Sequence, residues 1–184
     1  MLPFVTKLLF SKQLSFEAGK FTIFGHRVMI FPVDLLLVLN KRCDKDKELR
    51  KMLYTAMKEA VYGFAMDIDR SQNISKGDMA GFLTNLTEMN GYGKIKIPKL
   101  DFDRKVAIFQ MFGLPSERQV GKIKHSPIDY YWAGMLAGGA SFVFKDKSIE
   151  CVEIKCVVSG KSPYCEFVAG KKEYVRKFRK SLFS

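Results

Sequence analysis

The segment best suited to chemistry is residues 150–170, which carries three of the four cysteines in the chain, Cys151, Cys156 and Cys165. β-Branched residues and alternation mark its first half as a strand, and the turn residues of "SGKSP" separate it from a returning strand, "YCEFV". The pattern predicts a β-hairpin. Because thiolates bind metal ions, a hairpin with paired cysteines is a candidate metal centre.

Cys156 and Cys165 should face each other across this hairpin. The predicted turn is centred between Gly160 and Lys161, and the two cysteines lie equally far from that centre. Directly opposed residues place their Cβ atoms about 4.5 to 5.5 Å apart, which lets both thiolates bind one metal ion. The same spacing is also nearly close enough for a disulfide.

The spacing alone does not select a third ligand. In a regular strand Cys151 and Glu153 point to one face and Cys156 points to the other, because side chains alternate. Glu153 could join Cys156 only across a β-bulge, and spacing does not favour it over Cys151. The alternative for the whole group is that the cysteines are buried and act as small hydrophobic side chains.

The segments before the hairpin must position it. Residues 14–31 alternate short β-prone runs with glycine-containing breaks, which predicts a small antiparallel ribbon. Apolar residues then recur at spacings of three and four over 44–72, and this is the clearest amphipathic helix. A further helix should begin at Ser75, whose hydroxyl can cap the first turn with Asp78 three residues on.

Two strands and a helix with several glycines should follow. "KIKIPKLDF" and "KVAIFQMFG" alternate or run apolar, as strands do. "SPIDYYWAGMLAGGASFVF" is predicted as a helix in which Gly134, Gly138 and Gly139 allow close approach of another backbone. This order of helices and strands indicates an α+β domain with an antiparallel sheet.

The chain is long enough for one domain with a sizeable core, since it has 184 residues and 47% of them are hydrophobic. We therefore expect a single domain over residues 1–184. Its parts are an N-terminal apolar segment and ribbon at 1–31, the glycine-bearing helix and cysteine hairpin at 126–170, and a basic tail at 171–184.

The formal net charge of +12 lies partly in the tail, which has six basic residues and one acid. Such a tail could contact an anionic membrane surface or a nucleic acid, or it could pack on its own domain with a solvated basic face. No helix-turn-helix or RNA-binding aromatic motif supports specific binding of nucleic acid. Weak contact with a membrane surface stays open.

The sequence indicates a cytoplasmic protein without an evident catalytic motif. The longest apolar run, "VMIFPVDLLLVL", is interrupted and shorter than the roughly 20 residues of a spanning helix, and the first ten residues lack the features of a signal peptide. GxSxG, HExxH, CxxC and phosphate-binding glycine loops do not occur. With only His26 and His125 as histidines, few general bases are available, so enzymatic activity is not indicated.

The run "GASFVFKDKSIECVEIKCVVSGKSPYCEFVAG", preceded by "SPIDYYWAGMLAGG", resembles the C-terminal signature of the 4-vinyl reductase domain family. The resemblance covers about residues 126–168. Members of that family bind small molecules and include archaeal hydrocarbon-binding proteins, a bacteriochlorophyll-biosynthesis protein and the sensor domains of phenol- and xylene-responsive transcription activators. The resemblance implies a homodimer with a ligand-binding fold like that of vesicle-tethering subunits and NO-signalling domains.

The resemblance also implies a zinc site. The family pattern of an acidic residue three positions before a cysteine, with a second cysteine after a glycine turn, is met by Glu153, Cys156 and Cys165. It therefore favours Glu153 over the other cysteine of the strand. The fourth ligand of the family is commonly a cysteine, and Asp129 stands at that position here, with His125 as a nearby alternative. Aspartate is also a zinc ligand in proteins.

The function that the resemblance implies is non-catalytic binding or sensing of a small hydrophobic molecule, a hydrocarbon or an aromatic compound. A cavity is expected between the sheet and the helices, lined by residues such as Phe102, Phe109, Tyr130, Tyr131, Trp132 and Phe142. Two alternatives are a dimeric scaffold of the vesicle-tethering fold without a ligand, and an enzyme of tetrapyrrole metabolism.

Overall fold

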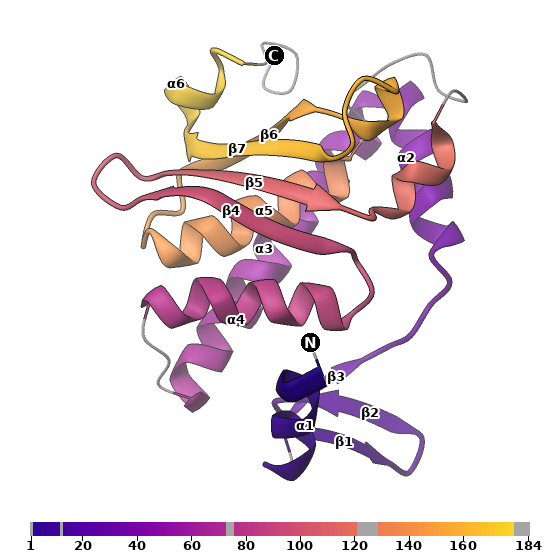
Figure 1. Cartoon of the computed structure of the whole chain (residues 1–184), viewed down its shortest axis with the longest axis vertical. Coiled ribbons are helices and arrows are strands. Elements are labelled where there is room, and N and C mark those ends of the chain that lie inside the picture. Colours follow the sequence, from indigo (N-terminus) through magenta and orange to yellow (C-terminus); the bar gives the residue numbers. More distant parts are fainter. Residues whose placement is uncertain (1, 12, 73–75, 121–128, 179–184) are drawn as a thin grey trace.

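The body of the protein is a four-stranded antiparallel sheet with helices packed on one face (Figure 1). The computed structural model describes residues 2–11, 13–72, 76–120 and 129–178. The strands lie in the order β4 (Lys94–Asp101), β5 (Val106–Phe112), β7 (Cys165–Lys171) and β6 (Ile149–Lys155). The predicted α+β class with an antiparallel sheet is confirmed, and the predicted cysteine hairpin is the β6–β7 pair.

Helices cover one face of this sheet and also lie beside it and on its other face (Figure 1). The covered face carries α3 (Lys47–Gln72), α4 (Lys76–Met89) and α5 (Tyr130–Val143), while α2 (Asp34–Lys45) lies at one side and α6 (Lys172–Val175) on the opposite face. Two short 3-10 helices, η1 (Pro115–Gln119) and η2 (Val157–Ser159), complete the body.

The helix predicted over 44–72 is α3, which begins slightly later than predicted. The carboxylate of Asp46 accepts hydrogen bonds from the backbone N–H groups of Glu48 and Leu49, each 3.0 Å long. Asp46 therefore caps the first turn of α3 and separates it from α2. The capping role predicted for Ser75 falls outside the described residues.

The backbones of α3 and α5 touch each other at two glycines. A Cβ atom on Gly134 would collide with the carbonyl oxygen of Tyr54, and one on Gly138 would collide with that of Lys58. The prediction of close backbone approach is therefore right for these two positions. Gly139 differs, because a Cβ there would meet only the Leu83 side chain at 3.4 Å, an ordinary contact.

The N-terminal segment forms a unit of its own beside the body (Figure 1). It consists of α1 (Leu2–Phe10) and the predicted ribbon, whose strands are β1 (Leu14–Glu17), β2 (Lys20–Ile23) and β3 (His26–Val28). Two-residue loops join the strands, and all four loop residues have positive φ, as type I′ hairpin turns require. Residues 29–33, which belong to no helix or strand, lead from this unit to α2.

The basic tail begins by packing on its own domain. Val175 of α6 is fully buried against Val152 and Val168 on the outer face of the sheet. Residues 179–184, which include part of the basic cluster, lie outside the described residues. Within the described part of the chain, no helix has the length and apolar character needed to cross a membrane.

Candidate ligand cavity and metal centre

A β-bulge in β6 turns Glu153 and Cys156 toward the same side of the hairpin. Glu153 pairs with Phe167 of β7, but Lys155 pairs with Glu166, so Ile154 is one extra residue in the ladder. An extra residue inverts the alternation of side chains beyond it. Strict alternation, which had separated Glu153 from Cys156, therefore does not hold at this point.

Asp129, Glu153, Cys156 and Cys165 form one buried cluster. One potential ligand atom from each lies within 4.8 Å of those of the other three. The Sγ atoms of Cys156 and Cys165 are 4.0 Å apart, and the Cys165 thiol donates to Asp129 Oδ2 over 3.4 Å. All four residues predicted as metal ligands are thus brought together. Cys151 lies outside the cluster, with its backbone N–H donating to the Tyr54 hydroxyl.

Hydrogen bonds from three elements hold Asp129 in place at the N-terminal end of α5. Its Oδ1 accepts from Asn40 Nδ2 of α2 over 3.1 Å, and its Oδ2 accepts from Ser116 Oγ of η1 over 3.0 Å. Its backbone N–H donates to Glu153 Oε2 over 3.2 Å. His125, the predicted alternative to Asp129, falls outside the described residues.

The cluster gathers four acidic groups, all of them buried. Burial and the neighbouring Cys156 raise the pKa of Asp129 to about 7, and burial with Asp129 and Cys156 raises the pKa of Glu153 well above its usual range. A hydrogen bond with Cys156 and burial raise the pKa of the Cys165 thiol. Four such groups do not ionise together without a compensating positive charge.

The residues present fit a bound divalent metal ion. Glu153 is 2% exposed, yet its Oε1 has no hydrogen-bond partner among the described residues. The backbone N–H of Val157 already donates to Cys165 Sγ over 3.3 Å, an arrangement that suits a thiolate. Two sulfur and two oxygen donors in a compact group form a set that could hold a metal ion.

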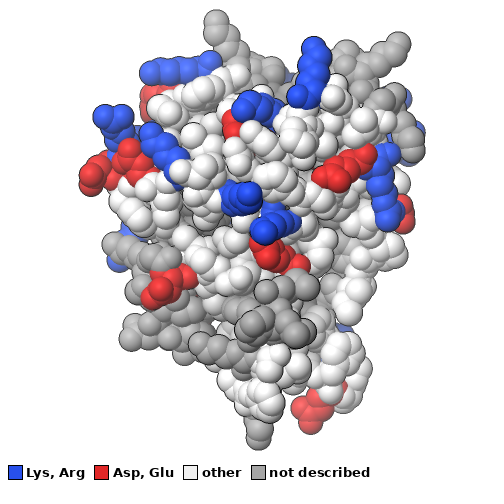
Figure 2. Space-filling view, in the orientation of Figure 1, with Lys and Arg blue, Asp and Glu red and all other residues white. Residues whose placement is uncertain are grey.

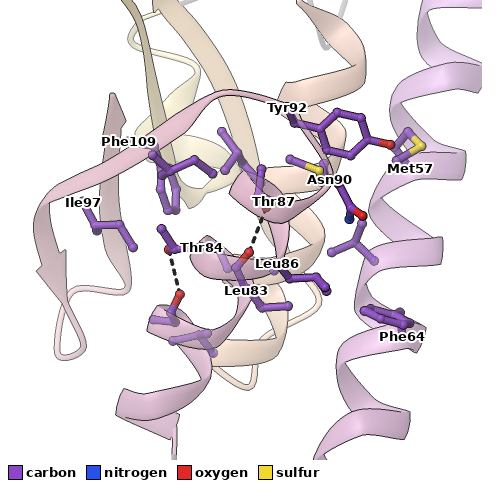
Figure 3. Close-up of a pocket in the computed structure, with 18 of the residues that line it drawn as sticks. Met57, Phe64, Leu83, Thr84, Leu86, Thr87, Asn90, Tyr92, Ile97 and Phe109 are labelled. Atoms are coloured by element: carbon purple, nitrogen blue, oxygen red, sulfur yellow. Dashed lines mark hydrogen bonds between the residues drawn. The ribbon is translucent and has the colours of Figure 1, made fainter. Parts of the chain in front are cut away.

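A second feature, an apolar cavity of about 310 Å³, lies between the helices and the sheet. Side chains of α3, α4 and α5 line it together with β4, β5 and two ribbon residues, Ile23 and Val28. Figure 3 shows Leu83, Leu86 and Thr87 of α4 across from Met57 and Phe64 of α3. The ribbon therefore supplies part of the wall that the body leaves open.

Of the residues predicted to contact a ligand, Phe109 and Tyr131 line this cavity. The remaining four lie outside its lining. Phe102 is 46% exposed and packs on Phe144, while Trp132 is buried against Tyr92 and Tyr131.

The last two of these four also pack elsewhere. Tyr130 lies beneath the Arg50 guanidinium, 4.7 Å from the ring centre, and Phe142 packs edge-on to Tyr62. Tyr131 lies on the same face of α5 as Met135 and Gly139, which also line the cavity, because residues four positions apart lie on one side of a helix. Tyr130 and Trp132 are each rotated by about 100° from Tyr131, in opposite directions, and pack against other residues.

Sequence reasoning missed most of the cavity wall. Its α4 side includes Leu83 and Leu86, which lie on a stripe that reads as ordinary core packing, and Thr84 and Thr87 beside them. The two threonines were the available signal, since hydroxyl groups on an otherwise apolar helix face are uncommon in a filled core.

Comparison with known proteins supports the fold. No family model and no curated protein matches the sequence. The phenol-responsive sensory domain of the transcription activator PoxR, solved with phenol, is similar in structure, with a TM-score of 0.75 at 15% identity over 100% of this chain and 97% of that one. Identity this low supports likeness of fold alone.

Two further solved structures match about three quarters of this chain, with lower TM-scores. A trafficking protein particle complex subunit 3 from Naegleria fowleri, covalently bound to palmitic acid, has a TM-score of 0.51 at 14% identity over 76% of this chain and 90% of that one. A vinyl-4-reductase family protein from Methanocaldococcus jannaschii has a TM-score of 0.49 at 16% identity, over 77% of this chain and 82% of that one.

Proposed function

We propose that this domain binds a small, predominantly apolar molecule in the cavity and acts as a sensor of it rather than as an enzyme. The observation that carries the proposal is the cavity itself. A volume of about 310 Å³ lies within the range of small-molecule sites, roughly 300 to 1,000 Å³. Its wall is mainly aliphatic and aromatic, as is typical of sites that bind apolar ligands.

The likeness to the PoxR sensory domain supports this proposal, because it extends over the whole chain and that domain was solved with phenol. The trafficking subunit offers a different precedent, a covalently held fatty acid. A cysteine thiolate is the most reactive nucleophile for such an attachment, and no cysteine is among the described residues that line the cavity. Reversible binding is therefore the form that we propose.

The second part of the proposal is that Asp129, Glu153, Cys156 and Cys165 hold one zinc ion. Zinc accepts both thiolate and carboxylate ligands in a tetrahedral arrangement. Its positive charge would compensate the buried acids and would give Glu153 Oε1 a partner. When bound, the ion would supply structural stability, because all four ligands come from the protein and none is left for a reacting water.

A thermal-shift screen of small aromatic and aliphatic compounds tests the ligand proposal. A ligand that binds only the folded state stabilises it by about 2.7 kcal/mol at a hundredfold excess over its dissociation constant. The matched control is Gly139→Leu, which places a side chain into the cavity from α5. Hits should shift the melting of the wild type and leave that of the variant unchanged.

The basic tail requires its own control, because it could bind an anionic amphiphile without a cavity. Truncation after Val175 removes most of the basic cluster and keeps the buried packing of α6. Binding in the cavity should survive this truncation and high salt, whereas binding to the tail should be lost under either. If no compound stabilises the truncated protein, the proposed function is wrong.

We also infer that two copies associate through the N-terminal unit. Of twelve exposed large apolar side chains among the described residues, three lie in this unit, Leu9, Phe10 and Phe16, and three more follow it directly, Met29, Ile30 and Phe31. Among the described residues that Figure 2 shows at this end of the molecule, most are uncharged, while charges are spread over the body. Exposed apolar surface of this extent is typical of an interface.

A further inference from the structure

If the cavity binds a small molecule, as proposed above, its wall also selects the chemical class of that molecule. No acidic or basic side chain is among the described residues that line the cavity. A charged ligand group would have to leave water without an ion partner, which is strongly unfavourable. The ligand should therefore be neutral where it contacts this wall.

Five polar side chains line the cavity, and two of them have already used their only proton. Thr84 Oγ1 donates to the carbonyl oxygen of Ala80, and Thr87 Oγ1 donates to that of Leu83, each over 2.8 Å (Figure 3). These hydroxyl groups can accept a hydrogen bond but cannot donate one to a ligand. A third polar residue, Asn90, is exposed, so its amide is open to water.

The remaining two, Tyr92 and Tyr131, form an incomplete pair. Their hydroxyl oxygens are 3.4 Å apart, whereas a well-formed O–H···O hydrogen bond spans about 2.5 to 3.0 Å. At most one of the two protons can lie between them. No other hydrogen bond of either hydroxyl is found within the described part of the chain, so at least one donor remains for a ligand.

The two tyrosine rings are held in position by Trp132. Its ring centre lies 4.7 Å from that of Tyr92 and 4.8 Å from that of Tyr131, both in edge-to-face contact. Trp132 is itself 1% exposed, so this support is fixed by the core. Burial raises the pKa of Tyr131, which keeps its hydroxyl protonated as a donor.

We infer that the ligand is a neutral molecule with an apolar body and a single hydroxyl or carbonyl group, whose oxygen is bound by the Tyr92 and Tyr131 hydroxyls. The cavity of about 310 Å³ has room for about ten waters at roughly 30 Å³ each. A fused bicyclic aromatic with one hydroxyl is of suitable size. Its ring system would lie against the aliphatic wall, which includes Ile97 and Leu83.

Three probes of nearly equal shape test this inference: naphthalene, 2-naphthol and 2-naphthoate. Their dissociation constants are measured by calorimetry at neutral pH on the full chain, on Tyr131→Phe and Tyr92→Phe, and on Tyr62→Phe. Tyr62 provides a matched control because it loses the same hydroxyl outside the cavity. A net hydrogen bond is worth about 0.5 to 1.5 kcal/mol, so 2-naphthol should bind about 2- to 13-fold more tightly than naphthalene.

That preference should disappear in the Tyr131→Phe, Tyr92→Phe double variant and persist in Tyr62→Phe, with 2-naphthoate binding weakest throughout. Equal binding of naphthol and naphthalene to the wild type would overturn the inference while leaving the proposed function intact. A preference that survives in the double variant would also overturn it, because the hydroxyl would then be bound elsewhere. Failure of all three probes would count against the proposed function itself.

Discussion

Two adjacent glycines of α5 should respond to the same substitution in opposite directions. Gly138 faces the backbone of α3, where an added Cβ collides with the Lys58 carbonyl oxygen and lies 3.1 Å from Tyr62 N. Gly139 faces the cavity, where the added Cβ makes only an ordinary contact with Leu83. Gly138→Ala and Gly139→Ala therefore change the helix identically and differ only in what the new methyl group meets.

The expected magnitudes follow from these contacts. Alanine is about 1 kcal/mol more favourable than glycine inside a helix, and burying one methyl group adds about 0.8 kcal/mol. Gly139→Ala should therefore raise the free energy of unfolding by roughly 1 to 2 kcal/mol, or about 2 to 8 °C in melting temperature for a chain of this size. Gly138→Ala gains the same helix propensity, but pushing two backbones apart should cost about 3 kcal/mol or more, at or above the upper end for an overpacked core.

Urea denaturation followed by circular dichroism measures both variants, with calorimetric melting as an independent check. The decisive quantity is the difference between them, because helix propensity cancels in it. We expect Gly138→Ala to be less stable than Gly139→Ala by at least about 3 kcal/mol. Equal stability of the two variants would show that α3 and α5 are not in backbone contact at Gly138.

Three further predictions concern the metal centre and association. Elemental analysis should find about one zinc ion per chain in the wild type and in Cys151→Ser, and none in Cys156→Ser. Zinc retained in Cys156→Ser would contradict the ligand assignment. In metal-free protein, Asp129 has a folded pKa of about 7 against 3.8 unfolded, so its stabilising contribution is complete below about pH 4 and lost as the pH rises through 7. The wild type should accordingly lose stability relative to Asp129→Asn over that range in urea titrations, and parallel curves would refute this. Phe10→Ser with Met29→Ser should shift sedimentation toward monomer, and a wild type that is already monomeric at high micromolar concentration would exclude the dimer.

The cysteine hairpin could be predicted well because its determinants are local. The turn residues placed the centre of the hairpin between Gly160 and Lys161, and Cys156 and Cys165 do lie together. Strict alternation predicted that Glu153 points away from Cys156. This prediction is wrong because Ile154 forms a β-bulge, and nothing in the sequence "VEIKC" indicates that one residue is extra.

The sequence could predict that a cavity exists between the sheet and the helices, but not most of the residues that line it. Its wall combines five elements and the ribbon, so membership of the wall depends on how helices rotate against one another. Phe109 is predictable as inward-facing by alternation on β5, and it does line the cavity. The place of Ile23 in the wall could not be predicted in this way. The position of the ribbon depends on packing of Phe24 on Phe82, a contact between residues 58 positions apart. Sequence spacing carries no information at that range.

One rigid element links the two candidate sites. Asp129, held by Asn40 and Ser116, is followed one residue later by the first turn of α5, and Tyr131 faces the cavity from that turn. Whatever fixes the carboxylate also fixes the rotation of the helix about its axis. Ligand affinity would then depend on how much metal each preparation contains. The linkage is reciprocal: if metal tightens ligand binding by some factor, ligand tightens metal binding by the same factor, which an equilibrium titration with a chelator would measure.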